Sequence, residues 1–98
     1  MTISKQKNGS ELTMALKGRL DTTTAPDFEK ELKESLDGVN SLILDCGELD
    51  YVSSAGLRVL LFAHKTMSAR DGMKIIHANE IIREVFDVTG FADFLKVE

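Results

Sequence analysis

The chain has 98 residues, a length that suits one domain built around a single hydrophobic core. Hydrophobic residues make up 43% of it and charged residues 29%, which is typical of a folded soluble domain and excludes a disordered chain. The formal net charge of −4 argues against a nucleic-acid partner, because such partners are bound by basic surfaces. We therefore expect one acidic domain over residues 1–98.

The sequence also indicates where the protein works. No apolar run approaches the roughly twenty residues that cross a membrane, and the first residues, MTISKQKNGSEL, lack the apolar stretch of a signal peptide. The single cysteine, Cys46, cannot form an internal disulfide and suits a reducing compartment. We expect a cytoplasmic protein without a membrane span, present as a monomer or as a weak dimer.

The first predicted element is a β-hairpin. Residues 11–20, ELTMALKGRL, alternate apolar and polar side chains with the period of two that is typical of a half-buried strand. The Asn8-Gly9 pair just before them is of the kind that hairpin turns favour. We therefore expect residues 2–7 to pair back onto residues 11–20 as an edge strand.

A helix is predicted next, over the stretch APDFEKELKESLD. Thr24 stands where a capping residue belongs, and Pro26 suits the first helical turn. Apolar residues recur at every fourth position from Phe28, and Gly38 is expected to end the helix. Because Thr24 supplies the cap in this interpretation, Asp21 is expected to add little to the stability of the fold.

A buried strand and a long helix follow. Residues 41–46, SLILDC, form a short continuous apolar run, which predicts a central strand buried on both faces. The helix is expected from about Ser54 to Ala69, where Asp71-Gly72 stops it. Residues 47–56, GELDYVSSAG, are then the passage from strand to helix.

The last third of the chain completes the pattern. Residues 73–78, MKIIHA, predict another strand, and Asn79 is expected to cap a helix that runs through Val88 and is broken by Gly90. The closing FADFLKVE predicts a short helical turn and an edge strand. This order indicates an α/β fold, a mixed sheet of four to five strands with helices packed on it and at least one right-handed parallel crossover.

The helix predicted after the SS pair has apolar side chains on two sides. Leu57 and Leu61 lie on one side, whereas Ala55, Val59 and Phe62 lie nearly opposite at 100° per residue. A simple surface helix carries one apolar stripe. The second stripe therefore packs against a neighbouring helix or is offered to a partner.

The passage 47–56 is the strongest candidate for a functional site, because open sheets of this kind carry their functional surfaces where strands pass into helices. Ser53 or Ser54 falls at the helix cap, a structural role worth about 1 kcal/mol. A cap leaves Gly56, beside the small Ala55, unexplained, since a better helix former would serve at that position. The free N–H groups at a helix N-terminus also favour the binding of anionic oxygen atoms, such as those of a phosphate on a serine.

The stretch LDCGELDYVSSAGLRVLL resembles the signature of the STAS domain, the fold of bacterial anti-sigma factor antagonists. In that family a partner kinase phosphorylates a serine that follows an Asp. Ser54 falls on that serine, and Ser53, which falls on the Asp, is the second choice. GRLDTTTAPDFEKEL resembles the family's Gly-x-Leu-Asp loop and places Asp21 on an acidic residue near the phosphorylated serine.

The resemblance implies a binding module that docks an anti-sigma factor or serine kinase while unphosphorylated and releases it once Ser54 is phosphorylated. A phosphatase would restore the docking form. The domain itself then needs no catalytic residue, metal or cofactor. The residues expected to contact the partner lie in the two motifs and on the helix that follows: Asp21, Thr22, Ser53, Ser54, Ala55, Gly56, Arg58 and Phe62.

Two alternatives remain open. The domain could be a STAS subunit of another assembly, in stress signalling or lipid transport. It could also be a hydrolase with Ser54 as nucleophile, whose base would have to be His64 or His77. The sequence lacks the Gly-x-Ser-x-Gly elbow of such enzymes, and His77 has no Cys or acidic neighbour at metal spacing. Cys46 is expected to be a small buried hydrophobe.

Overall fold

The computed structural model describes residues 1–98 and begins with the predicted hairpin. Strands β1 (Thr2–Asn8) and β2 (Glu11–Leu20) pair antiparallel, so β1 is an edge strand as expected. Asn8 pairs with Glu11, and the turn is therefore Gly9-Ser10, one residue later than predicted. Gly9 takes the positive φ of +63° that such a two-residue turn requires.

The remaining elements alternate as strand and helix. Every strand pair after the hairpin is parallel, and the sheet order is β1-β2-β3-β4-β5, which confirms the predicted α/β fold with a mixed sheet. None of the helices has the length and apolar character that crossing a membrane requires. The elements after β2 are α1 (Ala25–Ser35), β3 (Ser41–Val52), α2 (Ser54–Ser68), β4 (Gly72–Ile76), α3 (Glu80–Thr89), a 3-10 turn (Phe91–Asp93) and β5 (Lys96–Val97).

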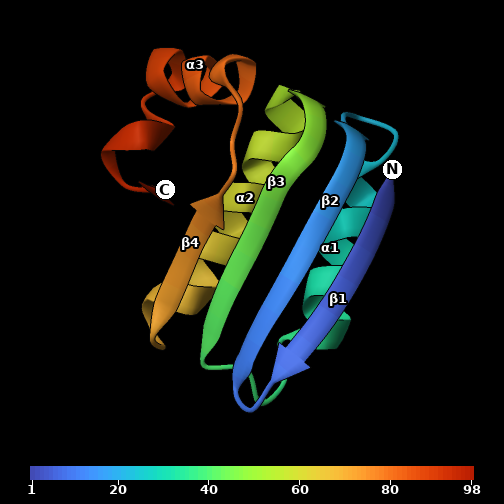
Figure 1. Ribbon diagram of the computed structural model, residues 1–98, viewed down its shortest axis with the longest axis vertical. Helices are drawn as coiled ribbons and strands as arrows, with labels where there is room; N and C mark the ends of the chain where they lie inside the picture. Colours follow the sequence, from blue (N-terminus) through green and yellow to red (C-terminus); the bar gives the residue numbers. More distant parts are fainter.

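Helices α1 and α2 lie behind one face of the sheet and leave the other face open (Figure 1). Alternate side chains of β3, Leu42, Leu44 and Cys46, point into the core on the helix side. Ile43 and Asp45 point to the open face and are only half-buried. The prediction that residues 41–46 are buried on both faces is therefore wrong, because no helix covers the second face.

Strand β3 is also longer than predicted. It continues to Val52, staying paired with β2 through two register shifts, one between Ala15 and Lys17 and one between Gly18 and Arg19. Residues 47–52 are thus strand and not loop, and Ser53 alone joins β3 to α2. The start of α2 is consequently fixed to the end of the sheet.

The helix ends test three sequence predictions. Asn79 caps α3 by accepting a hydrogen bond from the Ile82 N–H at 2.9 Å, and Gly90 ends it with a φ of +81°, both as predicted. Thr24 precedes α1 but does not cap it with its side chain. Its hydroxyl instead donates to the Arg19 carbonyl at 2.7 Å and accepts from the Asp21 N–H at 2.9 Å, so the threonine holds the loop before the helix.

Candidate functional site at the start of α2

Parallel pairing of β2 with β3 brings the two sequence motifs together. Arg19 lies opposite Tyr51, and Leu20 lies opposite Val52. The Ser53 N–H then donates to the Leu20 carbonyl at 2.8 Å, which continues the ladder to the residue before α2. The GRLD loop and the SSAG helix start, more than thirty positions apart in the sequence, therefore meet at one end of the sheet (Figure 1).

The two serines have different roles. Ser53 is the capping residue of α2, with extended backbone and an Oγ that accepts from the Gly56 N–H at 3.3 Å. Ser54 is the first residue of the helix, and its side chain is exposed. The cap is therefore assigned to Ser53, whereas the Ser54 hydroxyl faces solvent and is accessible to an enzyme.

Gly56 is buried and has a packing role. A Cβ at this position would lie 2.6 Å from Leu20 Cγ and 3.0 Å from the Leu20 carbonyl oxygen. The missing side chain lets the end of β2 press against the start of α2. From the sequence we expected Gly56 to leave its backbone accessible to a partner. Because Gly56 is buried, we leave it out of the candidate surface.

Asp21 organises the loop that precedes α1. Its Oδ1 accepts hydrogen bonds from the Thr23 hydroxyl at 2.7 Å, the Thr23 N–H at 3.0 Å and the Thr24 N–H at 3.2 Å. The bond from the Thr23 hydroxyl is the main cause that lowers the pKa of Asp21 from 3.8 to about 2, against the opposing effect of burial. Because Thr24 does not cap α1 with its side chain and Asp21 holds the loop instead, we expect Asp21 to contribute to stability, which replaces the expectation from the sequence.

An aromatic contact connects this loop to β3. The Arg19 guanidinium lies over the Tyr51 ring, with Cζ 4.3 Å from the ring centroid, and its Nε is 3.5 Å from Asp21 Oδ2. Tyr51, Arg19 and Asp21 thus form a continuous chain of contacts beside the helix start. Sequence reasoning missed this chain, because the parallel register that places Arg19 opposite Tyr51 is set by the tertiary structure.

A groove of about 300 Å³ separates the first turns of α1 and α2, and Ala55, the residue after Ser54, lines it. Helix α1 covers one side of Val59, which is buried, and this accounts for much of the second apolar stripe of α2. Arg58 is exposed at the groove and forms no ion pair. The lining residues are Thr22, Ala25, Pro26, Glu29, Ala55, Arg58 and Val59.

Phe62 lies farther along α2, where it is half-buried. It packs against the core, and the Lys33 ammonium of α1 lies 5.5 Å from the centroid of its ring. Phe62 does not line the groove. Phe62 therefore lies apart from the other residues that were expected to contact a partner. The fold brings the following six together: Asp21, Thr22, Ser53, Ser54, Ala55 and Arg58.

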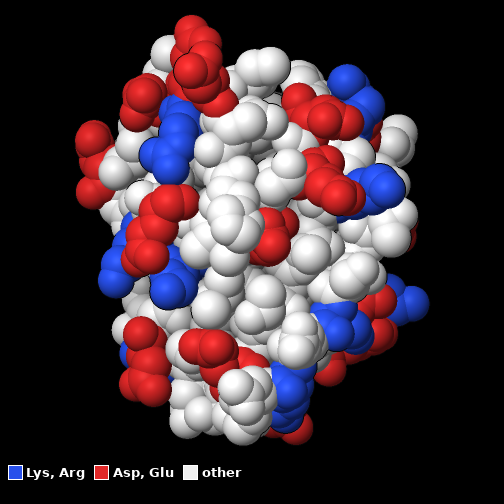
Figure 2. Space-filling model, viewed as in Figure 1, with Lys and Arg blue, Asp and Glu red and all other residues white.

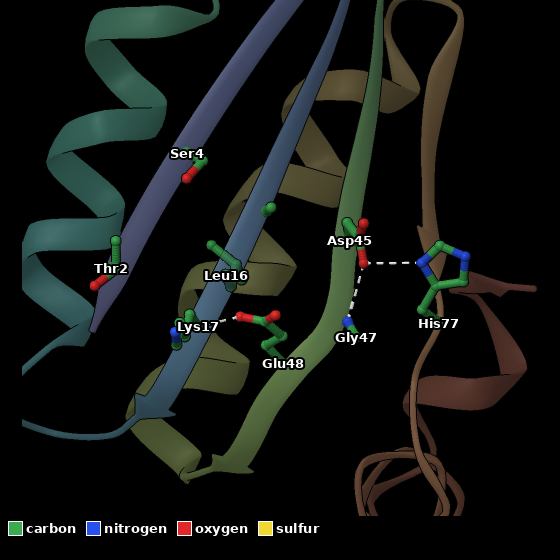
Figure 3. Close-up of a pocket in the computed structure, with 9 residues that line it drawn as sticks. Thr2, Ser4, Leu16, Lys17, Asp45, Gly47, Glu48 and His77 are labelled. Carbon is green, nitrogen blue, oxygen red and sulfur yellow. Dashed lines mark hydrogen bonds and ion pairs between the residues drawn. The ribbon is translucent and has the colours of Figure 1, made fainter.

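A second hollow, of about 470 Å³, lies on the open face of the sheet (Figure 3). Asp45 Oδ1 accepts from the Gly47 N–H at 3.0 Å and lies 3.0 Å from Nδ1 of His77, while Lys17 and Glu48 face each other at 3.7 Å. Burial raises the pKa of Asp45, but the bonds from Gly47 and His77 outweigh it and the net pKa is lowered. Sequence reasoning missed the acidic partner of His77, because Asp45 reaches it from another strand.

This open-face pair has a structural role in the connection from β4 to α3. His77 has a φ of +61°, a left-handed conformation that is uncommon for a residue with a side chain. Its bond to Asp45 ties that strained backbone to β3. No group of three or more His, Cys, Asp or Glu side chains converges here or elsewhere in a way that would hold a metal ion.

The other two side chains with reactive groups, those of His64 and Cys46, pack against neighbouring side chains. The His64 ring lies 4.9 Å from that of Phe94, centroid to centroid. Cys46 is buried in the core as predicted, and burial, helped by the charge of Asp45, raises the pKa of its thiol to about 12. The thiol is therefore protonated and unreactive at neutral pH.

A mixed sheet with helices on one face, a serine pair at a strand-to-helix junction and an acidic loop beside it are the features of one class of regulatory domain. The chain belongs to the STAS domain family, whose model matches residues 2–98. A relative from Bordetella bronchiseptica, a candidate anti-sigma factor antagonist named BtrV, is 34% identical over 99% of this chain and 85% of its own length.

Solved structures share the fold. An anti-sigma factor antagonist from Mycobacterium paratuberculosis superposes with a TM-score of 0.88 at 18% identity, over 98% of this chain and 83% of that one. The phosphorylated form of SpoIIAA from Bacillus superposes with a TM-score of 0.76 at 16% identity, over 99% of this chain and 91% of that one. At these identities the likeness demonstrates a common fold.

Proposed function

We propose that this chain is an anti-sigma factor antagonist, a binding module that docks an anti-sigma factor with serine kinase activity and releases it once Ser54 is phosphorylated. A phosphatase resets the module. The observation that carries the proposal is the exposed position of Ser54 as the first residue of α2, beside a groove and beside the Asp21 loop. The relatives named as anti-sigma factor antagonists support it.

The mechanism follows from the charge and bulk of the phosphate. A phosphoserine carries about −1.5 to −2 charges near neutral pH, and on Ser54 these would stand at the edge of the groove. The N-terminus of α2 tolerates an anion, because its free N–H groups and its dipole favour negative charge. The partner must approach the same edge of the groove. The charge and the bulk of the phosphate then weaken its binding, and the partner dissociates.

A hydrolase mechanism has less support from the geometry. A serine nucleophile needs a base within hydrogen-bond reach. His77 is bonded to Asp45 on the open face of the sheet, and His64 packs against Phe94. Neither histidine lies against Ser54, and no observation favours a different STAS assembly over the antagonist.

The test is phosphorylation by a partner kinase with ATP and magnesium, followed by tandem mass spectrometry. We expect phosphate on Ser54, binding without phosphorylation for Ser54→Ala, and normal phosphorylation for the matched variant Ser53→Ala. Loss of the Ser53 cap should cost about 1 kcal/mol of stability, whereas Ser54→Ala should cost less. Phosphate on Ser53 alone would contradict the assignment of the acceptor.

An esterase assay separates the module from the hydrolase. We expect no turnover of generic ester substrates above that of a blank. Turnover that disappears in Ser54→Ala would establish the enzyme and reject the binding module.

A further inference from the structure

Helix α3 carries an apolar stripe that the rest of the chain covers only in part, at Val85, which packs against the core. Ile82 and Phe86 anchor its inner face in the core. Ile81 and Val88 are 61% and 76% exposed, and Val85 between them is half-buried. At 100° per residue these three aliphatic side chains lie within about 60° of one another, so they form one stripe along the helix.

An acidic edge borders this stripe. Glu80, Glu84 and Asp87 lie on the outer side of α3, and none of the three takes part in an ion pair. The Nε of Arg83, the one basic group on the helix, donates to the Ala78 carbonyl at 3.0 Å. Figure 2 shows acidic side chains gathered at the upper left of the molecule, where Figure 1 places α3.

The charges select the kind of molecule that can cover the stripe. A second copy of this chain carries the same −4 net charge and the same acidic edge, and the surface of an anionic membrane is negative as well. Both meet repulsion. A cationic amphipathic segment instead covers the aliphatic side chains and pairs its Lys or Arg residues with the carboxylates.

We propose that α3 is a docking face for a cationic amphipathic helix of a partner protein. The partner lies along α3 with aliphatic side chains on Ile81, Val85 and Val88 and basic side chains opposite Glu84 and Asp87. Because α3 has ten residues and is therefore about 15 Å long, the contact spans two or three turns and is weak and transient. This face does not depend on Ser54 or on its phosphorylation.

The test uses a synthetic helical peptide with leucines on one face and lysines on the other, titrated into the ¹⁵N-labelled protein. We expect amide shift changes centred on residues 80–89. The double variants Ile81→Asn/Val88→Asn and Glu84→Lys/Asp87→Lys should each weaken binding by about tenfold, and both should keep the fold because the four side chains are exposed.

Glu34→Lys/Asp37→Lys is the matched control, since it reverses two unpaired exposed carboxylates three positions apart, Glu34 in the last turn of α1 and Asp37 in the turn that follows the helix. It should leave peptide affinity nearly unchanged. Equal weakening by this control, or shift changes spread over the whole acidic surface, would overturn the proposal. So would self-association through residues 81–88, or binding of the unlabelled protein to phosphatidylglycerol vesicles, because each identifies a different occupant.

Discussion

Asp21 links the stability of the fold to pH. Its folded pKa of about 2 lies below the ordinary value of 3.8, so the carboxylate stabilises the native state above pH 3.8. That contribution is lost as the pH falls from 3.8 through about 2. We expect Asp21→Asn to be less stable than the parent at pH 7 and to lose less stability on acidification, as followed by thermal unfolding at a series of pH values.

Asp50→Asn serves as the control for Asp21→Asn, because Asp50 is exposed on β3 and makes no ion pair. It removes the same charge without removing the bonds from Thr23 and Thr24. An identical acid dependence for the two variants would show that net charge, and not the Asp21 loop, sets the response to pH.

Gly56 is the residue whose replacement should disturb the site most. Alanine would bring Cβ within 2.6 Å of Leu20 Cγ, and its better helix propensity compensates only in part. We expect Gly56→Ala to lower the free energy of unfolding by about 1–3 kcal/mol in urea titrations, with a fall in the affinity for the partner.

A double-mutant cycle with Leu20→Ala tests the cause of that loss. Shortening Leu20 removes the side-chain clash but leaves the Leu20 carbonyl 3.0 Å from the new Cβ, so the rescue should be partial. Strictly additive effects of the two substitutions would mean that the Leu20 side chain does not cause the loss.

Between elements, Arg70 connects the end of α2 to the end of α1. Its guanidinium Nη1 donates to the carbonyls of Leu36 and Val39, just beyond α1. Arg70→Met keeps the aliphatic stem but leaves these carbonyls without the donor, and should cost about 1–2 kcal/mol of unfolding free energy. Arg58→Met, which removes a guanidinium from α2 that forms no ion pair, should change stability by less than about 0.5 kcal/mol.

The same measurement decides between packing and hydrogen bonding. If Arg70→Met and Arg58→Met unfold at the same urea concentration, the bonds to Leu36 and Val39 contribute nothing to the docking of the helices. A loss confined to Arg70→Met assigns the effect to those carbonyls.

For the whole molecule, we expect phosphorylation of Ser54 to change the surface and not the fold. The N-terminus of α2 favours the phosphate, while Asp21 and Asp50 repel it in part, with screening beyond about 8–10 Å in physiological salt. The melting temperature should stay nearly the same while affinity for the partner falls by about tenfold or more, about 1.4 kcal/mol in calorimetry.

Amide hydrogen exchange distinguishes this surface effect from a conformational switch. Protection should change near residue 54 and remain unaltered in β3 below residue 47 and in β4. Changes spread across these strands would show that the phosphate acts through the sheet, and the repulsion model would then be wrong.

The sequence by itself determined the elements and their order. Period-two alternation predicted β2, and the Asn8-Gly9 pair before it indicated the hairpin with β1. Asn79 and Gly90 marked the ends of α3, and the SSAGL and GRLD motifs indicated the family. These signals are local, since turns, caps and hydrophobic periods depend on neighbouring residues. The acceptor role of Ser54 remains a prediction from the resemblance.

Only the tertiary structure decided which groups meet. One face of residues 41–46 is exposed, and β3 extends to Val52. The hydroxyl of Thr24 forms hydrogen bonds in the Asp21 loop, and Asp45 pairs with His77. Each outcome depends on a partner distant in the sequence, and the register of parallel strands fixes that partner. Sequence periodicity reports how one strand or helix is patterned, but it does not reveal what covers its second face.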